Sequence, residues 1–108
     1  MKIGIRLALV LAIVACSAAA AAELAKGPSV KVADNVFRPT SLSIKKGATV
    51  TWRWAGRNPH NVTVTDGPRR FRSPTQKRGS FSHRFTARGA YTIVCTIHSG
   101  MVMHLKVR

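Results

Sequence analysis

The chain has 108 residues, of which 18 are Lys or Arg and only three are Asp or Glu, so its formal net charge is +15. This length supports one ordinary domain, and two cysteines are too few for a disulfide-stapled miniprotein. An apolar fraction of 45% excludes a disordered tail, while the charge alone suggests nucleic acid, an anionic membrane or an acidic protein as a partner.

Residues 1–22 have the features of a secretory signal peptide. Lys2 and Arg6 form the positive start, a short apolar stretch follows, and the alanines at 18–22 suit signal peptidase. The apolar stretch is shorter than the roughly 20 residues that a membrane-spanning helix needs. We therefore expect removal of this segment, export to the periplasm or another extracytoplasmic compartment, and a single mature domain over residues 23–108.

A lipidated form is the alternative. Residues 13–16, Ile-Val-Ala-Cys, resemble a bacterial lipobox, in which Cys16 would become the lipidated first residue. Only this outcome would attach the protein to a membrane. Cleavage after the alanine run instead removes two of the 18 basic residues, which leaves 16 against three acidic ones and a net charge of +13. Cys95 is then the lone cysteine, so it is either a buried small hydrophobe or a reactive ligand.

The rest of the chain alternates apolar and polar residues in the manner of β-strands. Turns that contain Gly47, Gly67, Gly79 or Gly89 separate these runs. The pattern predicts an all-β sandwich or barrel of about seven short strands, with a long loop over residues 65–77 that has room for one helical turn. The alternating residues are Val30, Val32 and Val36; Leu42 and Ile44; Val50, Trp52 and Trp54; Val62 and Val64; Phe81, His83 and Phe85; Tyr91 and Ile93; and Met103, Leu105 and Val107.

The candidate metal-binding residues lie in two places. One group directly follows the predicted strand that ends at Val94, and His60 directly precedes the predicted strand that contains Val62 and Val64. Cys95, His98 and Met101 fall within one short loop, which Gly100 allows to turn tightly. With His60 upstream, they supply the two imidazoles, thiolate and weak axial thioether of a type 1 copper site. Cysteine or methionine alone is usually packing, but their combination with two histidines favours copper. Zinc is less suitable, because structural zinc prefers four strong ligands and a thioether is a poor one.

These segments resemble the cupredoxins of the plastocyanin, amicyanin and pseudoazurin type. The resemblance extends over residues 29–108 and implies a Greek-key β-sandwich with copper at one end. The matching segments are residues 37–39, 44–47, 50–52, 59–62, 81–85, 89–91 and 95–101. The implied ligands are His60, Cys95 and His98 in the equatorial positions and Met101 in the axial one. Asn61 matches the residue that ties the two ligand loops together. Trp54 departs from the polar residue of many relatives, and the acidic patch of plant plastocyanins is missing.

The implied function is one-electron transfer, so we expect a carrier with no catalytic residue and not an enzyme. Copper storage, delivery or tolerance with the same ligands is the alternative. The outer edge of His98 is the expected electron port, with Pro59, Gly100 and Val102 around it. His83 is expected to be a surface or packing residue, and Met103 to lie in the core with His104 pointing the opposite way.

The excess of basic residues favours acidic redox proteins as partners, such as a cytochrome or a dehydrogenase, because complementary charge speeds their encounter. We expect the protein to be a monomer. Nucleic-acid binding is disfavoured by export, by the metal motif and by the lack of an aromatic stacking platform among the basic residues. A basic loop is either a docking surface or an ordinary solvated loop; its residues are Arg69, Arg70, Arg72, Lys77 and Arg78.

Overall fold

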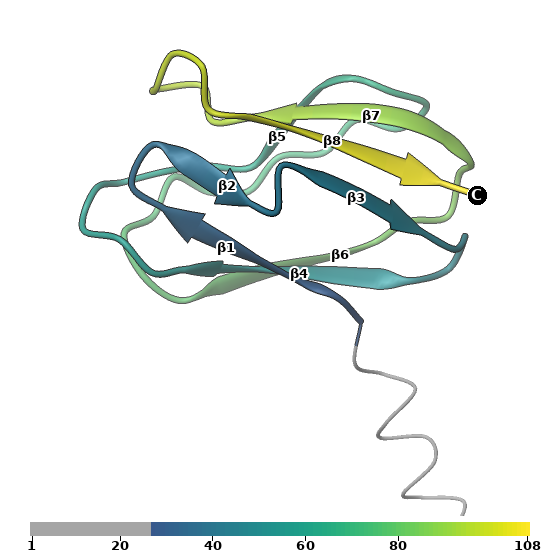
Figure 1. The fold of residues 1–108 in the computed structure, drawn as a ribbon, viewed down its shortest axis with the longest axis horizontal. Helices are drawn as coiled ribbons and strands as arrows, with labels where there is room; N and C mark the ends of the chain where they lie inside the picture. The colour runs from purple at the N-terminus through teal and green to yellow at the C-terminus, as the bar shows by residue number, and fades with distance from the viewer. Residues whose placement is uncertain (1–26) are drawn as a thin grey trace, which may run out of the picture.

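The computed structural model describes residues 27–108 (Figure 1). These residues form eight β-strands in two four-stranded sheets, which confirms the predicted all-β sandwich. None of them forms a helix long and apolar enough to cross a bilayer. The expected signal peptide and Cys16 lie outside the described residues. The strands are β1 (Ser29–Ala33), β2 (Val36–Arg38), β3 (Ser41–Ile44), β4 (Thr49–Trp54), β5 (Thr63–Asp66), β6 (Ser80–Arg84), β7 (Gly89–Val94) and β8 (Val102–Val107).

The prediction of about seven strands was low by one, because the first apolar run is split into two. A tight turn at Asp34 and Asn35 folds β2 back onto β1 as an antiparallel neighbour. Asn35 has a φ of 64°, in the left-handed region that asparagine tolerates better than most residues. The period-two pattern continues through this turn, so alternation alone does not reveal it.

The two sheets have the strand orders β2-β1-β4-β6 and β3-β8-β7-β5. β1 runs parallel to β4, and β3 runs parallel to β8, whereas the other neighbours are antiparallel. This arrangement brings the β1–β2 turn, the β4–β5 connection and the β7–β8 loop to one end of the sandwich (left in Figure 1). The C-terminus lies at the opposite end. Residues far apart in the chain can therefore meet at the first end.

The predicted loop over residues 65–77 begins two residues later than expected, because Thr65 and Asp66 belong to β5, and residues 67–77 contain no helical turn. Its backbone returns along the segment that leads into β5 and forms two isolated antiparallel bridges. One bridge joins His60 to Gln76, and the other joins Thr63 to Arg72. The backbone hydrogen bonds that a helical turn would use are thus made across the loop.

The core is centred on Trp52, whose side chain is fully buried. Its ring lies 6.1 Å from that of Phe71 and 6.1 Å from that of Phe81, between centroids. The indole N–H donates to the Sδ of Met103 at 3.4 Å, which joins the two sheets through a buried polar contact. Met103 is buried and His104 is exposed, as predicted from alternation along β8.

His83 lies on β6 and packs against aromatic rings, which is one of the two roles expected for it. Its imidazole stacks on Phe71, with ring centroids 3.8 Å apart and an interplanar angle of 14°. It also meets the ring of Phe85 edge-on at 5.0 Å. Partial burial in this stack lowers the pKa of His83 below its ordinary value, because the charged form loses hydration there.

Replacement of His83 by Gln is expected to reduce the loss of stability on mild acidification. Below the ordinary histidine pKa of 6.5, the unfolded state binds more protons at this position than the folded state does. The contribution of His83 to the free energy of unfolding is therefore present above that pH and is lost as the pH falls towards the lowered folded value. Urea denaturation of the metal-free protein at about pH 7.5 and about pH 5.5 measures the difference.

The matched control is His104→Gln, which removes an exposed imidazole from β8. His60 and His98 are present in the wild type and in both variants, so their effect cancels in the comparison. We expect His104→Gln to keep the acid dependence of the wild type. An acid dependence as steep in His83→Gln as in the wild type would contradict the assignment.

Candidate metal centre

His60 is held by its backbone between two neighbouring segments. Its N–H donates to the carbonyl of Gln76 at 3.0 Å, and its own carbonyl accepts from the Gln76 N–H at 3.0 Å. The same carbonyl accepts the indole N–H of Trp54 at 3.2 Å. Trp54, the departure from the family pattern, is thus a buried residue that supports His60. The imidazole of His60 is fully buried, so its position is set by the protein and not by solvent.

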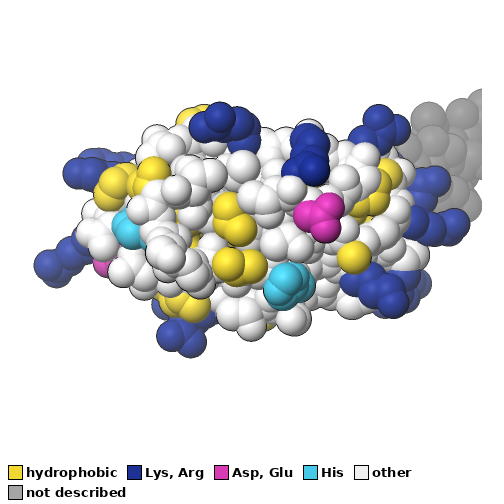
Figure 2. Space-filling model, turned by 90° about the horizontal axis from the view of Figure 1, so that it is seen from above, with side chains coloured by type: hydrophobic (Ala, Val, Ile, Leu, Met, Phe, Trp, Pro, Cys, Tyr) yellow, Lys and Arg dark blue, Asp and Glu magenta, His cyan; other side chains and the backbone are white. Residues whose placement is uncertain are grey.

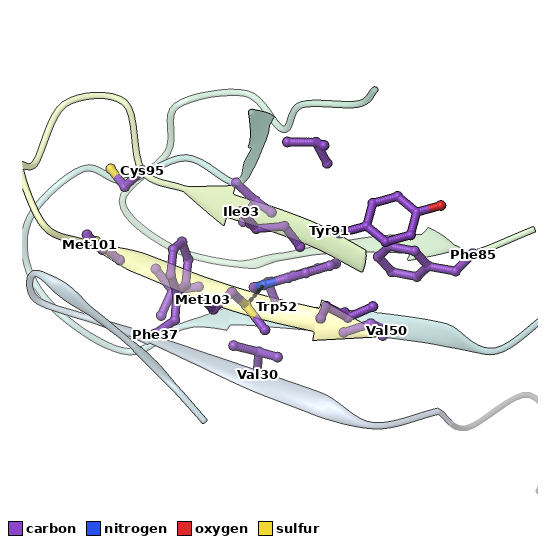
Figure 3. Close-up of a cluster of buried hydrophobic side chains, with 14 of the residues drawn as sticks. Val30, Phe37, Val50, Trp52, Phe85, Tyr91, Ile93, Cys95, Met101 and Met103 are labelled. Atoms are coloured by element: carbon purple, nitrogen blue, oxygen red, sulfur yellow. Dashed lines mark hydrogen bonds between the residues drawn. The ribbon is translucent and has the colours of Figure 1, made fainter. Parts of the chain in front are cut away.

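The β7–β8 loop closes on itself immediately after Cys95. The Cys95 N–H donates to the carbonyl of Met101 at 3.0 Å, and the Met101 N–H donates to the carbonyl of His98 at 3.4 Å. Gly100 has a φ of 79°, which allows the chain to reverse before Met101. Cys95 and Met101 are both buried, and Figure 3 places them at the same end of the core.

The donor atoms of His60, Cys95 and His98 converge, as the sequence predicted. The Nδ1 atoms of the two imidazoles lie 3.1 Å apart. The Sγ of Cys95 lies 3.5 Å from the Nδ1 of His98 and 3.9 Å from that of His60. These ligand atoms all lie within 4.8 Å of one another, with no carboxylate among them. This set of one thiol and two imidazoles fits copper, and the buried thioether of Met101 directly precedes β8.

Asn61 ties the two ligand-bearing segments together through its side chain. Its Nδ2 donates to the Oγ1 of Thr96 at 2.8 Å, and its Oδ1 accepts the Thr96 backbone N–H at 3.1 Å. The hydroxyl of Thr63 donates to the same Oδ1 at 2.8 Å. Asn61 is buried, so these contacts replace the hydrogen bonds to water that its amide has lost. They connect the residue after His60 to the residue after Cys95.

Replacement of Asn61 by Ala is expected to destabilise the protein by about 1–3 kcal/mol, because the Thr96 N–H and nearby hydroxyls lose buried partners. We also expect copper to dissociate faster, since the two ligand segments are no longer joined. Urea denaturation of the metal-free protein and competition with a chelator measure the two effects. Asn58→Ala is the control, because it makes the same change at an exposed position nearby. Equal effects in both variants would contradict the bridging role.

The sequence analysis missed Asp34, whose carboxylate contacts the Nε2 atom of His60. The Nδ1 atom of the same ring faces His98 and Cys95. The Oδ1 of Asp34 lies 3.1 Å from the Nε2 of His60. Its carboxylate also accepts the backbone N–H groups of Asn58 at 2.9 Å and Arg57 at 3.0 Å. Hydrogen bonds from Asn58, Arg57 and His60 lower the pKa of Asp34 to about 2, because they favour its charged form. The aspartate is therefore ionised at neutral pH.

The surface near the site combines apolar and basic side chains. His98 is partly exposed, unlike the other three expected ligands, and its neighbour Ile97 is 50% exposed. Figure 2 shows one face of the molecule, with basic side chains around its rim and few acidic ones. The basic loop residues Arg69, Arg70, Arg72, Lys77 and Arg78 are all exposed. Arg70 also donates to the backbone carbonyls of Val64 and Thr65, which fixes that side chain on the sheet.

Known proteins are similar to this chain in fold and in sequence. The family model of copper binding proteins, plastocyanin/azurin family, matches residues 27–108. Amicyanin-alpha of Methylorubrum extorquens is 34% identical over 76 residues, a match that covers 67% of this chain and 64% of that relative. The chain thus spans less than two thirds of the length of this curated relative.

Solved structures are similar over about three quarters of the chain. A reduced Cu(I) form of an amicyanin variant is 29% identical with a TM-score of 0.69, covering 76% of this chain and 82% of that one. A purple cupredoxin from Nitrosopumilus maritimus is 26% identical with a TM-score of 0.68, covering 75% and 99%. A Cu-containing nitrite reductase from Thermus scotoductus is 26% identical with a TM-score of 0.71, covering 77% of this chain but only 22% of that one. Together with the converging donors, these matches show that the chain belongs to the plastocyanin/azurin family of copper-binding proteins, with a type 1 copper site formed by His60, Cys95, His98 and Met101.

Proposed function

We propose that this protein is an exported, monomeric carrier of single electrons, and not an enzyme. The observation that carries the proposal is the convergence of the His60, Cys95 and His98 donor atoms within 4.8 Å at one end of a rigid sandwich. Copper would be held there by the imidazoles of His60 and His98, the thiolate of Cys95 and the thioether of Met101, and it would supply the Cu(II)/Cu(I) couple.

The protein contributes ligand positions that are fixed before any electron arrives. The backbone N–H and carbonyl of His60 are both hydrogen-bonded to the backbone of Gln76. The backbone N–H of Cys95 is hydrogen-bonded to the carbonyl of Met101 across the loop. Asn61 joins the two segments. Donors held in this way move little when the charge at the site changes, so the reorganisation that accompanies electron transfer stays small.

The expected route for electrons passes through the exposed edge of His98. His60 and Cys95 are buried, whereas His98 is partly exposed and is flanked by the exposed side chain of Ile97. Pro59 and Val102 are also partly exposed, and with Gly100 they complete the proposed contact face. A small apolar face of this kind allows a redox partner to approach closely and to leave again.

The charge of the chain favours an acidic redox partner, such as a cytochrome or a dehydrogenase. Only Asp34 and Asp66 are acidic among the described residues, and the first is engaged by His60. Lys77 and Arg78 directly follow Gln76, whose backbone is hydrogen-bonded to that of His60. They therefore lie close to the end of the sandwich that carries the copper ligands. Opposite charges steer encounter between proteins, and salt screens that attraction. The expected signal peptide supports export, and we propose the periplasm as the location.

The test is to purify the copper-loaded protein, to record its visible and paramagnetic resonance spectra, and then to measure electron exchange with a small acidic cytochrome. We expect an intense blue band, narrow copper hyperfine splitting and an exchange rate that falls as salt is added. Lys77→Glu is expected to slow the exchange more than Lys106→Glu, which makes the same charge change at the far end of β8. A blue protein with very slow exchange would favour copper storage or delivery, and a colourless copper complex would overturn the proposal.

A further inference from the structure

The carboxylate of Asp34 is placed against His60 by the fold and not by the local sequence. Asp34 lies in the β1–β2 turn, next to Asn35 with its left-handed backbone. The parallel pairing of β1 with β4 carries this turn to the loop that follows Trp54. There the side chain reaches the Nε2 of His60 at 3.1 Å while remaining 38% exposed on its outer side.

The hydrogen-bonding capacity of the two groups fixes the protonation of the imidazole. Both carboxylate oxygens of Asp34 accept backbone N–H groups, and the Nε2 of His60 lies 3.1 Å from Oδ1, so Nε2 is the donor in this contact. In a neutral imidazole the Nδ1 atom then has a free lone pair. That atom is the one that faces the Nδ1 of His98 and the Sγ of Cys95. The contact with Asp34 thus selects the tautomer in which His60 can bind a metal.

The loop after β4 holds the carboxylate of Asp34 in place. The backbone N–H groups of Arg57 and Asn58 both donate to it. Gly56 leaves the necessary space, because a Cβ atom added there would lie 2.1 Å from the Oδ1 of Asp34. The position of the carboxylate is therefore set by contacts on three sides and does not depend on an exposed, freely rotating side chain.

We propose that Asp34 is a positioning residue of the copper site, which orients His60, fixes its tautomer and increases the electron density of its imidazole. The proposal deepens the proposed function and rests on the copper site, but not on the identity of any redox partner. Carboxylates that accept the outer N–H of a metal-bound histidine raise the basicity of the ligand. A more basic imidazole favours Cu(II) over Cu(I), so Asp34 is expected to lower the reduction potential.

The first test is Asp34→Asn in the copper-loaded protein. The amide keeps an oxygen for the Arg57 and Asn58 N–H groups but lacks the negative charge. We expect Cu(II) affinity, measured by chelator competition, to fall by roughly 10- to 100-fold, the usual effect of losing such a partner. A tenfold loss confined to Cu(II) raises the potential of a one-electron couple by about 59 mV. Asp66→Asn is the matched control, because it removes the same charge from the last residue of β5.

A second variant, Gly56→Ala, keeps the charge of Asp34 but displaces it, because the new methyl group occupies the space of Oδ1. We expect it to shift the reduction potential in the same direction as Asp34→Asn. The double variant should resemble Asp34→Asn alone, because both changes weaken the same contact between Asp34 and His60. Nitrogen and proton NMR of the metal-free protein should show a slowly exchanging Nε2 proton on His60 in the wild type and in Asp66→Asn, but not in Gly56→Ala, which displaces the accepting oxygen.

The two proposals fail in different ways. Failure of the wild type to show the blue spectrum or to exchange electrons counts against the proposed function, whereas the Asp34 proposal depends on differences between variants and on the NMR signal. Unchanged Cu(II) affinity and potential in Asp34→Asn, relative to Asp66→Asn, would overturn it, and so would an unchanged Nε2 proton in Gly56→Ala. Loss of stability without a change in potential in both Asp34→Asn and Gly56→Ala would also overturn it, because Asp34 would then only support the loop.

Discussion

Replacement of Cys95 by Ser is expected to abolish the blue band and to weaken copper binding until the protein no longer retains the metal during purification. Cys95 is the only thiol among the described residues, and its Sγ lies 3.5 Å from the nearest imidazole nitrogen of the site. A serine hydroxyl remains protonated at neutral pH and is a hard donor, so it replaces neither the charge nor the softness of a thiolate. Visible absorption, paramagnetic resonance and copper analysis measure the loss.

The fold should survive this change, because a hydroxyl is similar in size to a thiol and Cys95 lies at the end of the core. We expect the metal-free variant to lose about 1 kcal/mol of stability, which is typical of a single substitution. Met103→Leu is the control for removal of a buried sulfur, since the Sδ of Met103 accepts the indole N–H of Trp52. It should remain blue. Retention of the blue band in Cys95→Ser would show that the assigned thiolate is wrong.

Most of the copper site could be predicted because its ligands form a local pattern. Cys95, His98 and Met101 share one loop, where their spacing is visible without knowledge of the fold. His60 lies far upstream, and its membership of the site depends on the two sheets packing together. The similarity to cupredoxins supplied this link, and the distances in the structure agree with it.

Contacts that depend on strand pairing could not be predicted. Asp34 reaches His60 only because β1 lies parallel to β4, and no alternation of apolar residues specifies that pairing. Its signal in the sequence was indirect, since it is one of only three acidic residues in a chain with 18 basic ones. An isolated carboxylate in such a chain is more informative than one carboxylate among many.

The aromatic packing over Trp52 was missed for a related reason. Phe71 lies in a segment that is polar on average, so the pattern indicated a loop and no contribution to the core. In the structure its ring packs on Trp52 and stacks on His83, and it closes one side of the core. Averaged polarity describes a loop correctly but does not identify the single apolar residue that anchors it.

Replacement of Trp52 by Ala is expected to destabilise the protein by about 3–5 kcal/mol, a large part of the roughly 5–15 kcal/mol that stabilises an ordinary domain. The side chain is fully buried, its ring contacts Phe71, Phe81 and Phe85, and its N–H bonds to Met103. The remaining cavity would lie between the two sheets, where rigid strands limit collapse. Thermal denaturation of the metal-free variant should show a decrease in Tm of more than about 10 °C.

Trp52→Phe separates the filling of this space from the hydrogen bond to sulfur. Phenylalanine keeps most of the ring volume but lacks the indole N–H, so we expect a cost below about 1.5 kcal/mol. Both variants should give a normal blue spectrum when loaded at low temperature, because Trp52 lies behind the ligand end of the core and not in it (Figure 3). A similar loss of stability in both variants would show that Trp52 stabilises the protein mainly through its hydrogen bond to Met103. A normal spectrum despite a large loss of stability would show that the ligand loops hold the copper site in place even when the core behind it is weakened.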